Sequence, residues 1–593
     1  MVQVDDALTT WTTAKTGVIR ELGYSGDVDT LFDPLTAHLA AAADVLSALP
    51  IDSVLKGFRS QSGLPAPGEG LSGWAAITAE STFGQWVSGL ARLSRVLDEP
   101  SLAAHAVALV DGYSATLPKS GETGMTIYGW EKLICGLVDT VVYAGYEPAS
   151  ELLSKLVRGA SFDQTRPLPV PHDPAGAGTQ HTREWYTLPE NLYRGFEATG
   201  DELLVDFARL WHYDAYWDRF FQPTGPTASW DIPPWLHAYS HVNTFASAGA
   251  ALDFSGDQRY LRILENAHRW LVETQCYASG GYGPAELTVP ADGSLGNALE
   301  WRTDTAEIIC GTWAAFKLSS LLLRHTGDVH YLDWPERLLY NGLLAALPLH
   351  HDGRSPYYAD YRLGTAAKTL YWDAWPCCSG TYAQAFSFVP NLVYQSVDED
   401  GIAISLYVPS TLRTRVGGQA LALEQQTRFP EETASMIHIL EGPLQEVTLW
   451  ARIPSWAAHV DVRLNHSTSV FAQAGTWLAI RRRWHAGDTL TIDLHPRLAP
   501  SPVDRFHPNR VALHYGPVLL AQDAVASTPL SAPVPLGMLD WQSLLARDGD
   551  QLLFRPLAPG SPPLPAGNLR PLYDFPEAHP YRVYFDLDTP RVI

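Results

Sequence analysis

A short Gly-Asp punctuation recurs along the chain and constrains its fold more than any other feature. It appears as Thr199-Gly200-Asp201, Ser255-Gly256-Asp257 and Thr326-Gly327-Asp328. Glycine takes the left-handed conformation that ends a helix, and aspartate caps the start of the next one. Leu97-Asp98-Glu99-Pro100 is a degenerate copy in which proline opens the next helix. These signals predict helical hairpins that recur every ~50–70 residues, arranged as a solenoid or as a closed ring.

The segments between these signals have the pattern of amphipathic helices. Apolar residues recur at three-and-four spacing in 90–97, 102–113, 133–143, 203–216 and 261–272. Long loops rich in His, Trp, Pro and Gly separate some of them, as in 163–184 and 222–234. In an array of hairpins, long loops gathered on one face commonly build the functional site.

The pattern changes after about Phe386. Apolar and polar residues alternate in 402–408, 447–453, 477–480 and 490–494, with turns such as 485–488 between them. This alternation predicts an antiparallel sheet, most simply a β-sandwich. The last ninety residues contain further short strand patterns, at 511–514 and 581–585. We therefore predict a helical domain over 1–385, a β-sandwich over 386–500 and a second β-rich segment over 501–593.

Composition narrows the classes of partner. The 593 residues carry a formal net charge of −23, which argues against nucleic acid and anionic membranes as partners. The sequence contains no run of 18 apolar residues, so no membrane-spanning helix is predicted. Residues 1–14 lack the basic start and apolar core of a secretory signal, and the five cysteines are an odd, low number. Together these features predict a cytoplasmic protein with free thiols.

Two adjacent cysteines, Cys377 and Cys378, are the most distinctive chemical feature. Neighbouring thiols do not easily form a disulfide with each other, but both can face one soft cation where Pro376 and Gly380 allow a bend. A third thiol, Cys310, follows Glu307 at a spacing that places both on one helix face. Three sulfurs and a carboxylate make a tetrahedral zinc set. The alternatives are a closed structural zinc site without chemistry, or thiols that are merely small buried hydrophobes.

Other side chains are candidates for proton transfer or sugar binding. Glu286 follows a glycine-rich loop in an apolar setting, which suits a carboxylic acid to give a proton, although it could also be a solvated residue. His237 and His241 share a helix face and suit a metal, or a substrate hydrogen bond from His237 with His241 in the core. Glu184 and Glu190 begin a helix after a long loop, where a carboxylate either binds sugar hydroxyls or favours the positive helix end.

The order of these motifs resembles the β-L-arabinofuranosidase group of glycoside hydrolases, family 127 with its relative family 146, formerly a domain of unknown function. The resemblance covers most of residues 50 to 400. It is carried by Leu236-His237-Ala238, Ser279-Gly280-Gly281, residues 310–318, Glu336-Arg337-Leu338-Leu339-Tyr340-Asn341 and the cysteine pair. It implies an (α/α)6 barrel followed by β-sandwich domains. It also implies a zinc-dependent retaining exo-glycosidase acting on a carbohydrate substrate.

The resemblance implies a specific catalytic, metal-binding or sugar-binding role for several of these residues. Cys377 is expected to be the nucleophile and Glu286 the acid/base. Cys310, Cys378 and Glu307 are expected to bind Zn²⁺ together with Cys377. His237 matches a sugar-contacting histidine of the family.

Three departures concern the metal and the sugar. The family's Glu-x-Cys is here Glu307-Ile308-Ile309-Cys310, and its Tyr-x-x-His-Lys is Tyr128-Gly129-Trp130-Glu131-Lys132. Its Gly-His-Tyr is Gly84-Gln85-Trp86. Gln85 and Glu131 are thus expected to line the pocket as two altered sugar contacts, with Trp130 as a further substrate-binding candidate, which leaves arabinofuranose specificity open.

Other functions remain compatible with the same barrel. A sugar epimerase or a polysaccharide lyase would use His, Tyr or Glu as bases, because a fold does not fix a function. A non-catalytic carbohydrate-binding protein would use the cysteines only for structure. A homodimer is possible through an edge of the β domain.

Overall fold

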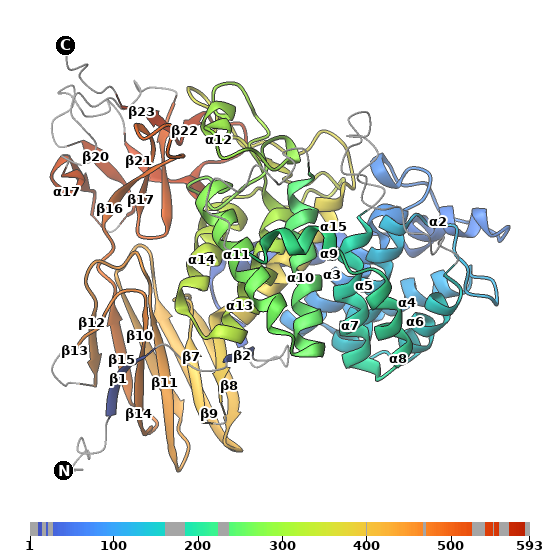
Figure 1. Cartoon of the computed structure of the whole chain (residues 1–593), viewed down its shortest axis with the longest axis horizontal. Coiled ribbons are helices and arrows are strands. Elements are labelled where there is room, and N and C mark those ends of the chain that lie inside the picture. The colour runs from blue at the N-terminus through green and yellow to red at the C-terminus, as the bar shows by residue number, and fades with distance from the viewer. Residues whose placement is uncertain are drawn as a thin grey trace.

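The computed structural model describes most of the chain as a helical barrel beside three β-sheets (Figure 1). The described residues are 10–14, 19–21, 28–160, 184–222, 236–398, 400–465, 470–524, 540–549, 551–556 and 568–587. The predicted loops 163–184 and 222–234 lie outside the described residues except for their ends.

Six helices of the described chain form a closed ring. Each contacts the next one along the chain, and the last returns to the first. The ring helices are α3 (Glu80–Val96), α5 (Ile127–Ala144), α7 (Leu188–Thr199), α10 (Ala238–Ser255), α13 (Ile308–Thr326) and α15 (Cys377–Phe388). Further helices pack against the outside of the ring, namely α1 (Asp33–Ser47), α4 (Pro100–Ser114), α6 (Pro148–Arg158), α8 (Glu202–Leu210), α11 (Gln258–Thr274) and α14 (Asp333–Leu338). The predicted (α/α)6 barrel is confirmed, and the ring is closed.

The Gly-Asp punctuation works as predicted. Gly200, Gly256 and Gly327 have φ values of 73°, 70° and 66° and end α7, α10 and α13. The aspartate that follows each glycine accepts a backbone N–H two residues further on. One predicted helix is wrong in part, because the periodic segment 203–216 is interrupted after Leu210 and resumes in α9 (Asp214–Trp217).

Two large sheets form the middle of the chain and confirm the predicted β-rich region. The six-stranded sheet has the order β1 (Thr10–Ala14), β14 (Thr476–Arg483), β11 (Glu446–Ile453), β7 (Gly401–Ile404), β6 (Tyr394–Val397), β2 (Ile19–Glu21). The seven-stranded sheet has the order β13 (Val470–Phe471), β12 (Asp461–Leu464), β15 (Thr489–Asp493), β10 (Ala434–Glu441), β9 (Gln419–Thr427), β8 (Ser410–Val416), β3 (Val28–Thr30). In β10, Ile437 and Ile439 are buried whereas Met436 and Leu440 are exposed, so this sheet has one packed face and one solvent face.

The third sheet follows in the last part of the chain. Its main order is β16 (Leu498–Pro502), β17 (Arg510–Tyr515), β18 (Val518–Asp523), β21 (Leu569–Pro571), β20 (Phe554–Pro556), β19 (Leu545–Arg547), with β22 (Tyr581–Arg582) and β23 (Phe585–Asp586) beside it. Figure 1 shows this sheet next to the barrel, above the six- and seven-stranded sheets in this view. The predicted limits of the three domains stay predictions, and the described N-terminal strands pair with the middle sheets.

Buried charge joins the barrel to the sheets. Arg452 on β11 is fully buried, and its Nη2 lies 2.6 Å from a carboxylate oxygen of Asp333 and 2.9 Å from one of Glu336 on α14. The Trp456 indole N–H donates to the same Glu336 oxygen at 2.7 Å. Asn341 donates to the Pro517 carbonyl and accepts from the Leu519 N–H of the third sheet. Removing one partner of such a buried pair is strongly destabilising, so these contacts fix the barrel against the sheets.

No single helix of the described residues is long and apolar enough to cross a membrane. Only α1 taken together with α2 (Ile51–Gln61), a pair bent by 50°, passes that test of length and composition.

A buried histidine that joins α1 to the ring predicts how stability depends on pH. His38 Nδ1 lies 2.5 Å from the Tyr382 hydroxyl, and its ring stacks on Phe386 at 4.6 Å. Burial, with the Lys368 ammonium as a second cause, lowers the pKa of His38 to about 4. In the unfolded chain the pKa is about 6.5, so between these values the unfolded state binds a proton that the folded state does not.

We therefore expect His38 to contribute an acid-sensitive part of the stability. The free energy of unfolding should fall by about 3 kcal/mol from this group as the pH drops from about 6.5 to about 4. A His38→Gln variant should lose that slope in urea titrations at several pH values, whereas the exposed control His485→Gln should keep it. An unchanged slope in the His38 variant would contradict the assignment.

Candidate active site and metal centre

Several of the predicted site residues gather at the end of the barrel where ring helices α7, α10, α13 and α15 begin. His237 is the N-cap of α10, Glu307 is the N-cap of α13, and Cys377 and Cys378 are the first two residues of α15. Glu184 directly precedes the short helical turn that leads into α7. The N-terminus of a helix carries partial positive charge and free N–H groups, so this end of the ring favours anionic side chains.

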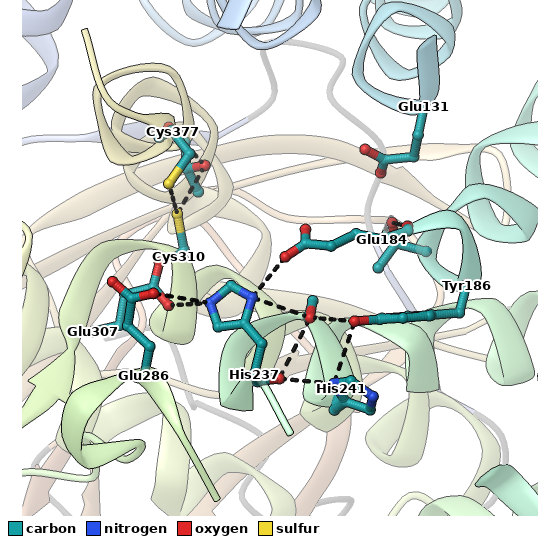
Figure 2. A network of polar contacts seen from close by, with 12 residues as sticks. Glu131, Glu184, Tyr186, His237, His241, Glu286, Glu307, Cys310 and Cys377 are labelled. Carbon is teal, nitrogen blue, oxygen red and sulfur yellow. Dashed lines mark hydrogen bonds and ion pairs between the residues drawn. The ribbon is translucent and has the colours of Figure 1, made fainter. Parts of the chain in front are cut away.

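Three cysteines meet in this place although two of them are far from the third in the sequence. Cys310 Sγ lies 3.3 Å from Cys378 Sγ and 3.8 Å from Cys377 Sγ (Figure 2). All three are at least 96% buried. The bend that aims the pair is at Trp375, whose φ is 57°. The predicted role of Gly380 in that bend is wrong, because Gly380 lies inside α15 and lets Gln85 pack closely.

Glu307 completes a buried cluster with the sulfurs. Its Oε1 lies 3.7 Å from Cys378 Sγ, and one ligand atom from each of the four residues lies within 4.8 Å of the others. Glu307 ends the short strand β4 (Ala306–Glu307), which pairs with β5 (Tyr358–Ala359), and Cys310 follows in the first turn of α13. The extra residue of Glu-x-x-Cys is thus accommodated at the strand-to-helix junction. A buried set of one carboxylate and three sulfurs is able to bind a metal ion.

The electrostatics of the sulfur cluster differ from one thiol to the next. Hydrogen bonds from the Cys310 and Cys378 thiols lower the pKa of Cys377 well below its usual value. The Tyr357 hydroxyl, 3.6 Å from Cys377 Sγ, and the Lys132 ammonium act in the same direction. Burial raises the pKa of both Cys310 and Cys378. Among the three, Cys377 is the sulfur that the protein itself favours as thiolate.

His237 links three carboxylates around the cluster. Its Nδ1 lies 2.6 Å from Glu184 Oε1, and its Nε2 lies 3.2 Å from Glu307 Oε2 and 3.7 Å from Glu286 Oε2. Figure 2 shows the imidazole between Glu184 on one side and the Glu286–Glu307 pair on the other. Burial opposes protonation of this ring, but Glu184 and Glu307 raise the pKa of His237 well above its usual value. A charged His237 holds these carboxylates in place.

Glu286 occupies a strained backbone position beside this network. Its φ is 63°, after Ala285 at 56°, in the left-handed region that non-glycine residues rarely occupy. The segment is held by a bridge between His237 and Leu287, and by the Glu286 N–H donating to the Gly283 carbonyl at 2.9 Å. The Tyr358 hydroxyl donates to Glu286 Oε1. The side chain stays 14% exposed, so it can reach a ligand from solvent.

A second charged pair faces the same space from α5. Lys132 Nζ lies 3.3 Å from Glu131 Oε2 and 4.3 Å from the centre of the Tyr128 ring. Figure 2 shows Glu131 directed towards the region of Glu184 and Cys377. Burial raises the pKa of Glu131, and the Lys132 ammonium opposes that shift. Glu131, which stands where the resembling family has a histidine, thus lies buried and paired with Lys132, and its role as a sugar contact stays a prediction.

Four predicted substrate contacts lie apart from that space or behind it. Gln85 donates to the Thr381 hydroxyl at 2.7 Å and supports the cysteine helix from behind. Trp130 is 1% exposed and packs edge-on against Phe207.

The remaining two lie deeper in the ring. His241 Nδ1–H donates to the His237 carbonyl, 2.9 Å away, within a layer of tyrosines. Glu190 pairs with Lys317 at 2.5 Å and lines a separate cavity with Arg194 and Arg324. Their binding roles stay predictions.

Sequence reasoning missed several residues that contact the cluster. The Thr381 hydroxyl lies 3.3 Å from Cys310 Sγ, and the Tyr357 and Tyr358 hydroxyls contact Cys377 and Glu286. The only available signal was that 357–358 follows Ser355-Pro356 in an aromatic stretch, which says nothing of its partner in space.

Two family models match consecutive parts of the chain. The model of the GH127 catalytic domain of β-L-arabinofuranosidases matches residues 28–391, and the model of the GH127 middle domain matches residues 401–496. No curated protein sequence matches the chain.

Solved structures with the same fold are distant in sequence. A GH127 β-L-arabinofuranosidase from Geobacillus stearothermophilus T6 has 17% identity and a TM-score of 0.70, covering 95% of this chain and 100% of its own. A GH127 β-arabinofuranosidase has 16% identity and a TM-score of 0.71, covering 97% and 99%. A glycoside hydrolase has 16% identity and a TM-score of 0.67, covering 97% and 100%. At this identity the likeness concerns the fold, whereas the two domain models identify the family. The chain therefore belongs to glycoside hydrolase family 127, the β-L-arabinofuranosidase family, and is a glycosidase that acts on carbohydrate.

Proposed function

We propose that this glycosidase is a zinc-dependent, retaining exo-hydrolase with Cys377 as nucleophile and Glu286 as acid/base. The observation that carries the proposal is the meeting of Cys310, Cys377, Cys378 and Glu307 in one buried cluster beside the His237–Glu286 contact. A purely structural metal site would not need a carboxylic acid beside it. Here Glu286 stands next to the cluster in a strained backbone conformation and is partly exposed, as is typical of functional residues. The arrangement supports a catalytic role for the cluster.

The donor set suits zinc. Thiolates are soft ligands that favour zinc over magnesium or calcium, and a carboxylate with three sulfurs gives the four ligands of a tetrahedral site. Glu307, Cys310, Cys377 and Cys378 would hold the ion, and His237 would orient Glu307 through its contact of 3.2 Å. When bound, zinc would keep the sulfurs deprotonated and in place.

In the first step, the Cys377 thiolate attacks the anomeric carbon. A carbon–sulfur bond forms there while the bond from that carbon to the leaving oxygen breaks, and Glu286 gives its proton to that oxygen. In the second step, the Glu286 carboxylate takes a proton from water. The water oxygen then bonds to the anomeric carbon, and the Cys377 thiolate leaves. Two displacements at one carbon retain its configuration.

The proposed substrate is a terminal β-L-arabinofuranoside or a closely similar sugar. The support is family membership together with the polar side chains of Glu131 and Glu184, which in Figure 2 are directed towards the region between them and Cys377. The ion pair of Glu131 and Lys132 borders this region, and we expect its polar groups to bind sugar hydroxyls. A screen of aryl furanosides and pyranosides, with anomeric configuration of the product followed by NMR, tests both the sugar and the retention.

Metal analysis tests the ligand assignment. We expect about one zinc per chain in the purified protein, and loss of turnover after chelation that added zinc restores. A Glu307→Gln variant should bind zinc at least about 10- to 100-fold more weakly, since losing a ligand carboxylate costs no less than losing a group that only orients a ligand. The matched control is Glu273→Gln, an exposed residue at the end of α11. Full activity in the chelated, metal-free protein would refute the metal-dependent part of the proposal.

A further inference from the structure

A second cavity lies where the barrel meets two of the sheets. It has a volume of about 370 Å³ and is lined from α11, α14, the end of β11 and the third sheet. Its lining includes His268, Trp334, Arg337, Trp456 and His514. We call it the junction cavity. Its volume lies in the range of ~300–1,000 Å³ that is typical of small-molecule sites.

Arg337 is the unusual residue of this cavity. It belongs to the motif Glu336-Arg337-Leu338-Leu339-Tyr340-Asn341, whose other polar side chains have partners across the domain boundary. Glu336 bonds Arg452 and Trp456, and Asn341 bonds the backbone of the third sheet. The Arg337 guanidinium forms no hydrogen bond or ion pair with any described residue. In a chain of net charge −23, a cation that lines a cavity without an ionic partner among the described residues is a specific feature.

Two neutral histidines flank this charge. His268 is 4% exposed, and its Nε2 is buried without a hydrogen-bond partner among the described residues. His514, 8% exposed, likewise forms no side-chain hydrogen bond in the described part of the chain. Burial, with Arg337 contributing, lowers the pKa of both histidines to about 3, so they are uncharged at neutral pH. Each offers one donor and one acceptor nitrogen.

The charge balance of the cavity selects a monoanion. The lining carboxylate Asp333 is held by Arg452 at 2.6 Å, which also holds Glu336 at 2.9 Å, and His330 pairs with Asp328 outside the cavity. The lining carboxylate thus already has an ionic partner, whereas the Arg337 guanidinium has none among the described residues. A single guanidinium matches one carboxylate rather than a phosphate dianion. A planar guanidinium binds a carboxylate through two parallel hydrogen bonds, whereas imidazole nitrogens suit hydroxyl groups. The half-buried ring of Trp456 provides apolar surface for the carbon face of a sugar, whereas Trp334 is 1% exposed and only backs the cavity wall.

We propose that the junction cavity binds a sugar unit that carries one carboxylate, a uronic acid residue. Its carboxylate would lie on Arg337 and its hydroxyls on His268 and His514. Trp334 also donates to the Gly280 carbonyl at 2.8 Å, so the cavity lies behind the loop that carries Glu286 and is separate from the cysteine cluster. The proposal goes beyond the catalytic assignment and does not depend on it.

Calorimetric titration of the full chain tests this site. Galacturonate should bind, and both its methyl ester and galactose should bind at least about tenfold more weakly, because each lacks the charge-assisted pair of hydrogen bonds. Arg337→Gln should weaken galacturonate binding about tenfold or more. The galacturonate affinity of Arg337→Lys should lie between those of the wild type and Arg337→Gln. Lysine keeps the positive charge but cannot form two parallel hydrogen bonds to the carboxylate. The control Arg262→Gln, an exposed arginine on α11, should bind as the wild type does.

Other results would overturn the proposal. These are equal binding of acid and ester, undiminished binding to Arg337→Gln, tighter binding of inorganic phosphate, or no binding of galacturonate up to about 20 mM. His268→Leu provides a second variant if Arg337→Gln unfolds, and it should also weaken binding. Turnover of an aryl arabinofuranoside by the Arg337 variants should be unaffected, so failure here and failure of the catalytic assignment are distinguishable.

Discussion

Replacing Cys377 with serine should reduce kcat on an aryl β-L-arabinofuranoside by on the order of 10⁴-fold or more. Serine has nearly the same shape but lacks a thiolate at neutral pH, so the covalent step would lose its nucleophile. Zinc content should be measured on the same sample, since Cys377 is also a proposed ligand. In the wild type, rapid acid quenching during turnover should leave one glycosyl mass on the peptide that contains Cys377.

Cys135 offers a matched control. It is a second buried thiol of the ring, and its sulfur lies 3.5 Å from the Gln384 amide nitrogen and 3.8 Å from an Asp139 oxygen. Serine fits such polar surroundings, so Cys135→Ser should keep its activity and its covalent labelling. Turnover near the wild-type rate in Cys377→Ser, or labelling of another residue, would contradict the nucleophile assignment.

Replacing Glu286 with glutamine should reduce kcat/KM by about 10²–10⁴-fold for a substrate with an alkyl leaving group. The loss should be much smaller for a nitrophenyl glycoside, because that leaving group departs without a proton. Water attack would then limit turnover, since no base assists it. Added azide needs no base, so it should raise the rate and give the glycosyl azide with retained configuration.

The same exposed Glu273→Gln variant serves as a control for Glu286, because it removes a carboxylate without touching the site. An equal loss for both leaving groups, without any effect of azide, would indicate that Glu286 only supports the loop. That outcome would leave Cys377 untouched as the proposed nucleophile. The two experiments therefore test the two steps separately.

Much of the fold could be predicted because its signals are local. A glycine in the left-handed conformation and an aspartate cap act within a few residues, so Gly256 and Asp257 mark a helix boundary without reference to the rest of the chain. The alternation in 447–453 likewise predicts β11. The break after Leu210 could not be predicted, because the apolar spacing continues across it. The pairing of residues 10–14 with β14 is a contact across more than 400 positions, and no short pattern encodes it.

The site was predictable where chemistry restricts the residue types. Three thiols and a carboxylate are typical metal ligands, so the sequence and the resemblance together predicted that Cys310, Cys377, Cys378 and Glu307 lie close to one another. The rotation of each helix was not predictable. Glu190 lies in the first turn of α7, yet its side chain pairs with Lys317 away from the cysteines. Glu184 could be identified from the sequence only as one of two possible sugar-binding carboxylates. No pattern near it predicts its contact of 2.6 Å with His237.

The N-terminal strands have a consequence for how the chain is handled. β1 and β2 occupy the two outer positions of the six-stranded sheet, and β3 occupies one end of the seven-stranded sheet. Their partners β14, β6 and β8 lie more than 350 residues further along the chain. During translation, β1, β2 and β3 therefore stay unpaired until these later strands have been synthesised. A version shortened by thirty residues would present three bare strand borders with unpaired N–H and C=O groups. Such borders recruit other chains, so shortened versions should precipitate even where the barrel itself folds.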